Sequence, residues 1–106
     1  MAEVSVTATA SRIASSLGLS ESELSRQALI SFVREQKRQA LQLTLDILSR
    51  YGADSLTDLE AKIAQGSVVE HPAWEDLIVA ENLTARLEEL NAYLDRLQGT
   101  TADSAE

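Results

Sequence analysis

The chain begins with strict alternation of apolar and polar residues from position 4 to position 9. A period of two places successive side chains on opposite faces of a β-strand. The pattern therefore predicts a short N-terminal strand with one apolar and one polar face. The apolar face consists of Val4, Val6 and Ala8, and the polar face of Ser5, Thr7 and Thr9.

A short helix and then a long helix are predicted next. Ser11 has the position of an N-cap and Gly18 that of a C-terminal glycine, which predicts about two helical turns between them. Ser20 and Glu23 have the spacing of a capping box, which starts a helix. Nothing breaks the helical pattern until Gly52, so we expect about 30 residues of helix, well above the usual length of about 11 or 12.

The long predicted helix carries two apolar stripes, and a single neighbouring helix covers only one stripe. The first stripe is Leu29, Val33, Ala40, Leu43 and Ile47, and the second is Leu41, Leu45 and Leu48. A chain of 106 residues builds a marginal core alone. We therefore expect a homodimer or a higher oligomer, with a core formed by Val4, Val6, Leu29, Val33, Ala40, Leu43 and Ile47.

Two further helices are predicted in the second half. Ser55 and Asp58 again have capping-box spacing, and the short helix that they start stops at Gly66. His71 is biased away from helical dihedrals because it precedes Pro72, which suits the first turn of the last helix. Leucines at three- and four-residue spacing make this helix amphipathic as far as Gly99. The fold class is therefore mainly α with one N-terminal strand, divided into residues 1–51, an acidic helical region 52–98 and a disordered tail 99–106.

Charge is distributed unevenly along the chain, whose net charge is −8. Residues 1–40 hold five bases and four acids, whereas residues 41–106 hold four bases and thirteen acids. The acidic half disfavours nucleic acid and suits a basic protein partner, although acidity also serves solubility alone. The sequence has no cysteine, no membrane-spanning run and no signal peptide, so we expect a cytoplasmic protein without membrane contact.

Catalytic and metal-binding candidates are few. His71 is the only histidine, and it has no cysteine to share a metal with. Glu75 and Asp76 are neighbours on a helix and point in different directions, which disfavours a two-carboxylate site. Phosphate-binding glycine motifs and nucleophile elbows are absent from the sequence. We therefore expect no enzymatic activity, no metal and no cofactor.

The order of strand, short helix and long helix over residues 3–38 resembles the ribbon-helix-helix superfamily of small dimeric repressors and antitoxins. In that family two strands pair into a ribbon that reads the major groove, and the second helix holds a phosphate at its N-terminus. The resemblance implies operator DNA as a partner, although a ribbon that only dimerises fits the same pattern. The implied DNA-binding residues are Ser5, Thr7, Thr9, Arg12, Ser20, Ser22 and Arg26.

The C-terminal part, with Tyr51-Gly52, an acidic helix, Gly66 and Trp74-Glu75-Asp76, is similar to uncharacterised prokaryotic antitoxin-like proteins. This resemblance implies a basic toxin as a partner of the last helix. The alternative is that its leucines pack on the long helix and that Trp74 plugs the joint between helices. The partner-binding candidates are Trp74, Leu83, Leu87, Leu90 and Leu94.

Together these features predict a small regulatory binding protein, antitoxin-like or a transcriptional regulator, which acts as a homodimer. The competing hypothesis is a structural or adaptor helical oligomer that binds no nucleic acid.

Overall fold

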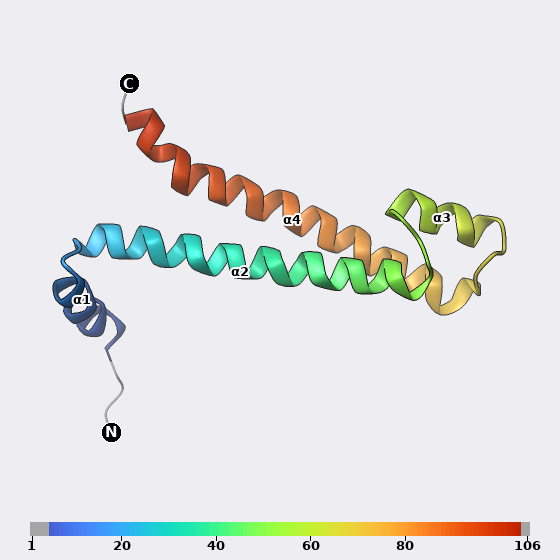
Figure 1. Cartoon of the computed structure of the whole chain (residues 1–106), viewed down its shortest axis with the longest axis horizontal. Helices are drawn as coiled ribbons and strands as arrows, with labels where there is room; N and C mark the ends of the chain where they lie inside the picture. Colours follow the sequence, from blue (N-terminus) through green and yellow to red (C-terminus); the bar gives the residue numbers. More distant parts are fainter. Residues whose placement is uncertain (1–4, 105–106) are drawn as a thin grey trace.

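The computed structural model describes residues 5–104, and the side chains of residues 5–99. It contains four helices, α1 (Val6–Leu17), α2 (Glu21–Arg50), α3 (Leu56–Ala64) and α4 (Glu70–Ser104). As Figure 1 shows, α2 and α4 run antiparallel as a long hairpin, α3 folds over its closed end, and α1 projects from its open end. The prediction of a mainly helical fold is correct.

The predicted N-terminal strand is wrong. Residues 6–9 form the start of α1, and no residue of the described range 5–104 is in a strand. The Ser5 hydroxyl caps this helix by accepting a hydrogen bond from the amide of Ala8 at 3.2 Å. A helix satisfies its backbone groups locally, whereas a lone strand leaves them unpaired. Val4 lies outside the described residues, and the predicted cap at Ser11 lies inside α1.

Local capping positions α2 and α3 as the sequence predicts. The Ser20 hydroxyl accepts from the amide of Glu23 at 2.9 Å, and the Ser55 hydroxyl accepts from the amide of Asp58 at 3.0 Å. Just beyond the C-terminus of α2, Gly52 has φ of 63°, a left-handed conformation that glycine adopts without a Cβ penalty. The long helix and the short helix are therefore confirmed.

The last helix begins as predicted but ends later than predicted. His71 is non-helical, with φ −113° and ψ 128°, which is the conformation expected of a residue that precedes proline. The peptide bond between His71 and Pro72 is cis. At the other end α4 continues past Gly99 to Ser104. A single glycine lowers helix stability by only about 1 kcal/mol, so it does not by itself end a long helix.

Two small apolar clusters hold the helices together. The closed-end cluster joins α2, α3 and α4, and the hairpin cluster joins α2 and α4 nearer the open end. In the closed-end cluster the buried residues are Ile47, Leu48, Leu59, Leu77 and Ala80. In the hairpin cluster they are Ile30, Val33, Leu90 and Leu94.

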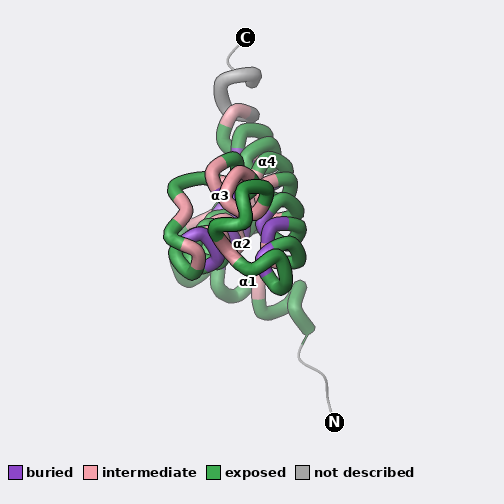
Figure 2. The backbone as a smooth tube through the Cα atoms, turned by 90° about the vertical axis from the view of Figure 1, so that its right-hand side faces the viewer, coloured by how far each residue is buried: buried purple, intermediate pink, exposed green. Residues whose placement is uncertain are grey.

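The molecule is one helical layer thick. Its Cα atoms extend over 59 × 47 × 16 Å, and an α-helix with side chains is itself about 10–12 Å across. The radius of gyration is 20.1 Å, against about 13 Å for a compact chain of this length. Figure 2, viewed from the closed end, shows few buried positions, and most of the described chain is exposed.

Candidate interaction surface

One face of the hairpin is hollowed along the contact between α2 and α4. A cavity of about 430 Å³ lies near the open end, and a smaller one of about 190 Å³ lies near the middle of the hairpin. Leu90 lines both, so the two adjoin, and we call them together the hairpin groove. The larger cavity is lined by Leu29, Phe32, Val33, Leu90, Tyr93, Arg96 and Leu97. The smaller is lined by Gln36, Gln39, Ala40, Leu43, Leu83, Arg86 and Leu90.

Large apolar side chains in this groove are open to solvent. Phe32 is 62% exposed, Leu43 52% and Leu29 51%, and Tyr93 on α4 is 40% exposed. Full burial of a leucine or phenylalanine side chain stabilises by about 1.5–3 kcal/mol. A row of such side chains along a groove is therefore a surface that favours contact with another apolar surface.

The open end presents a second apolar hollow, of about 410 Å³, between α1 and the start of α2. Ala14 is the one buried residue of α1, whereas Val6 is 80% exposed, Leu17 65% and Ile13 43%. A helix of 12 residues is marginal in water without tertiary packing. The apolar side of α1 is thus largely uncovered by the described chain.

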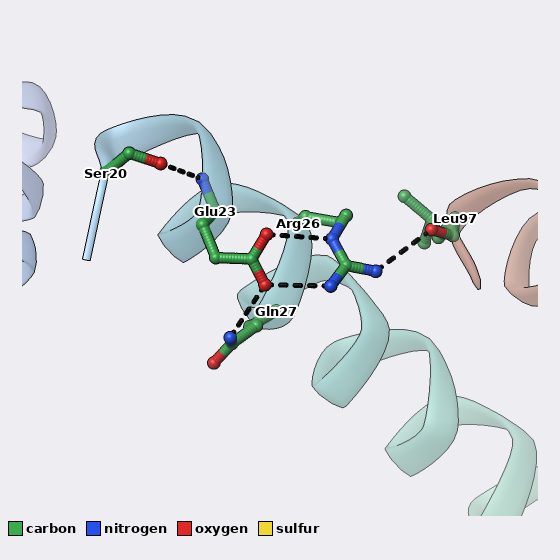
Figure 3. Close-up of polar contacts among 5 residues, drawn as sticks. All are labelled: Ser20, Glu23, Arg26, Gln27 and Leu97. Atoms are coloured by element: carbon green, nitrogen blue, oxygen red, sulfur yellow. Dashed lines mark hydrogen bonds and ion pairs between the residues drawn. The ribbon is translucent and has the colours of Figure 1, made fainter. Parts of the chain in front are cut away.

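Arg26 links the two long helices at the open end (Figure 3). Its Nε and Nη2 donate to the two carboxylate oxygens of Glu23 at 3.1 and 2.8 Å. Its Nη1 donates to the carbonyl oxygen of Leu97 on α4 at 3.3 Å. The hydrogen bonds from Arg26, and a further one from Gln27, lower the pKa of Glu23 to about 2. The guanidinium that was predicted to meet DNA instead contacts α4.

A polar contact also joins α2 to α4 at the closed end. The Asp76 carboxylate accepts a hydrogen bond from the Tyr51 hydroxyl and pairs with Nη1 of Arg50 at 2.9 Å. The contact with Asp76 stabilises the neutral phenol and, together with burial, raises the pKa of Tyr51 above its usual value. Each end of the hairpin thus carries a side-chain link between α2 and α4.

The predicted DNA-binding residues do not form a reading face. Ser5 and Ser20 cap helices, Arg26 contacts Glu23 and α4, and the remaining candidates are exposed on α1 and in the first turn of α2. Those exposed candidates are Thr7, Thr9, Arg12 and Ser22. Because the strand is absent, the ribbon that would have held Ser5, Thr7 and Thr9 in a groove is absent from the described chain as well.

The predicted dimer core is divided between two places. Val33, Ala40 and Ile47 are buried within the chain. Leu29 and Leu43 line the hairpin groove and are half exposed. Val6 is exposed on α1, and Val4 lies outside the described residues. The spacing of Leu29, Val33, Ala40, Leu43 and Ile47 placed them on one stripe of the long helix, but it did not separate the residues that α4 covers from those that it leaves exposed.

The partner-binding candidates of the last helix are divided in the same way. Leu90 and Leu94 are buried against α2, and Leu83 and Leu87 are partly buried. Trp74 is 42% exposed and is not part of either cluster, so it is not a buried core residue.

Two of the exposed apolar residues of the groove, Phe32 and Tyr93, were not predicted from the sequence. Each follows a predicted stripe leucine by three residues, Leu29 and Leu90 respectively. That spacing is the available signal, because residues three apart are neighbours on a helix surface.

His71, the histidine considered for a metal site, lies at the start of α4. His71 is exposed and its Nδ1 lies 2.8 Å from the Glu75 carboxylate, and this contact lowers the pKa of Glu75. Within residues 5–104 no cluster of three or more histidine or carboxylate side chains is placed to hold a metal ion. Among the described helices none combines the length and the apolar character needed to span a membrane.

Comparisons with curated proteins and with solved structures found no significant match. A protein-family model, in contrast, matches residues 1–102, which is nearly the whole chain. Its description states no function. The chain therefore belongs to the Uncharacterized protein MJ0235 family.

Proposed function

We propose that this protein is a non-enzymatic helical adaptor that works as a homodimer, with the hairpin groove of one copy packed against the groove of the other. The observation that carries the proposal is a helical layer 16 Å thick whose groove exposes Leu29, Phe32, Leu43 and Tyr93. Stable domains bury their apolar faces between two packed layers. A second copy supplies the missing layer.

The surface area of the chain supports this proposal. The accessible surface is 7471 Å², whereas a compact monomer of 11.5 kDa exposes about 5,800 Å². The excess is about 1,700 Å² per chain, or about 3,400 Å² for two copies, which falls in the range of about 2,000–5,000 Å² that obligate homodimer interfaces bury. One interface between two copies therefore suffices to restore an ordinary exposed area.

Packing of groove on groove is isologous, so each groove residue is used twice, once from each copy. Four long helices would then surround a shared apolar core, which is the arrangement of a four-helix bundle. Phe32 and Leu43 contribute the two most exposed apolar side chains of the groove, so they are the sites where a charge would do most harm.

The antitoxin-like role stays a prediction. Binding of a basic toxin is compatible with a helical homodimer, because the groove uses only one face of the hairpin. A DNA-reading ribbon is not part of this proposal, since residues 6–9 are helical.

Sedimentation equilibrium from 1 to 100 µM tests the proposal with two matched α2 variants. We expect the wild type to be a dimer and Phe32→Asp to be a monomer, because a buried carboxylate without a partner costs several kcal/mol. Leu41→Asp is the control, since Leu41 is 44% exposed and does not line the groove. A wild type that stays monomeric at 100 µM would refute the proposal, as would a Leu41→Asp variant that dissociates while Phe32→Asp remains dimeric.

A further inference from the structure

A cleft of about 320 Å³ lies at the closed end, between α3 and the beginning of α4. α3 contributes Glu60, Ile63 and Ala64 to it, and α4 contributes Glu70 and Trp74. We call it the Trp74 cleft. None of its lining residues lines the hairpin groove, so the two surfaces are separate.

Exposed apolar side chains lie in the Trp74 cleft and next to it along the chain. Trp74 is 42% exposed, and Ile78, one helical turn further along α4, is 46% exposed. Val69, which immediately precedes Glu70, is 74% exposed. Tryptophan is enriched among the few residues that carry most of the binding energy of protein interfaces, because it offers a large contact area.

The polar part of the cleft carries negative charge only. Glu60 and Glu70 line it, and neither has an ion-pair partner among the described side chains. No basic residue lines it. Two uncompensated carboxylates beside an indole ring match a ligand that places lysine or arginine next to an apolar anchor, because a cation also interacts favourably with the indole face.

A second copy of this chain is a poor occupant of the cleft. Its net charge of −8 would bring like charge to Glu60 and Glu70. The complementary occupant is therefore a different protein. We propose that the Trp74 cleft binds a basic amphipathic segment of another protein, with apolar side chains against Trp74 and Ile63 and with lysine or arginine side chains at Glu60 and Glu70. This binding goes beyond self-association and does not depend on it.

Trp74 is the only tryptophan, so its fluorescence reports on the cleft alone. The probe is a 14-residue peptide of leucine and lysine in helical amphipathic spacing. We expect a saturable blue shift of Trp74 emission when this peptide is added to the wild type. A peptide with the same lysines and serine in place of leucine should give no shift, because it lacks the apolar anchor.

Two double variants distinguish peptide binding in the cleft from a general effect of the net charge of the protein. Glu60→Gln with Glu70→Gln should weaken peptide binding about fivefold, as expected for two surface charge pairs. The control, Glu81→Gln with Glu88→Gln, removes the same charge from exposed positions of α4 outside the cleft and should bind the peptide as the wild type does. Equal weakening in both variants would reduce the effect to net charge and overturn the inference.

An absence of any blue shift with the leucine–lysine peptide would also overturn it. The Phe32→Asp variant tests peptide binding to the cleft independently of dimer formation. If the variant is monomeric and still shows the Trp74 shift, the cleft functions independently of self-association. If the wild type proves monomeric but shows the shift, only the proposed dimer fails.

Discussion

Leu59 is fully buried where α2, α3 and α4 meet, and it is the one buried residue of α3. Truncation of Leu59 to alanine removes the apolar contact that holds a nine-residue helix on the hairpin. Leucine-to-alanine changes at buried sites cost about 2–5 kcal/mol, through lost transfer free energy and the cavity that remains. We take about 3 kcal/mol for Leu59→Ala, a large part of the total stability of about 5–15 kcal/mol of a domain.

Urea unfolding at a fixed protein concentration, followed by circular dichroism at 222 nm, measures this loss. A loss of about 3 kcal/mol corresponds to a decrease in Tm of roughly 12–24 °C for a domain of this size. Leu45→Ala is the control, because Leu45 is 58% exposed on α2 and its truncation should change the free energy of unfolding by less than about 0.5 kcal/mol.

The dependence on urea shows whether α3 unfolds alone. A helix of nine residues is too short to persist without packing, so detached α3 would lower both the helical signal and the slope of the free energy against urea. A loss below about 1 kcal/mol with an unchanged slope would show that the closed end does not depend on Leu59, and it would refute the reasoning.

Two further predictions concern protons. The pKa of Glu23 is about 2 in the folded chain against an ordinary value of 4.5, so its contribution to stability is complete above pH 4.5 and is lost as the pH falls towards 2. The melting temperature of Glu23→Gln should therefore depend less on pH between 2 and 4.5 than that of the wild type. An identical pH dependence in the two proteins would exclude Glu23 as a cause. The pKa of Tyr51 is raised by Asp76, so absorbance at 295 nm in a Tyr93→Phe background should show the remaining tyrosine titrating above pH 10, and Asp76→Asn should shift this titration back down.

The sequence predicted the elements whose ends are fixed locally. Ser20 with Glu23 and Ser55 with Asp58 each place a hydroxyl on a backbone amide three residues later, and this contact needs no tertiary partner. The helices that follow these caps can therefore be predicted from short segments of the sequence. The spacing of Leu90 and Leu94 predicted an amphipathic helix but left partner binding and packing open, and the structure shows these two leucines packed against α2.

The N-terminal segment was misread because two periods coincide in it. Val6 and Ala8 alternate with threonines, but Val6, Ala10 and Ile13 also recur at helical spacing. The alternating pattern covers only six residues, whereas the helix is capped by Ser5 and continues to Leu17, so it satisfies more backbone hydrogen bonds. Trp74 was misplaced for a different reason, since exposure depends on how α3 packs on α4, and no local pattern records that packing.

The hairpin also determines where a tag or protein fused to either terminus would lie relative to the Trp74 cleft. α1 begins and α4 ends at the same, open end, whereas α3 and the Trp74 cleft lie at the closed end (Figure 1). The 30 residues of α2 separate these ends by about 45 Å. A fluorescent protein or affinity tag fused to either terminus would therefore extend away from the cleft, so immobilisation through a terminal tag should leave the Trp74 cleft accessible to a ligand.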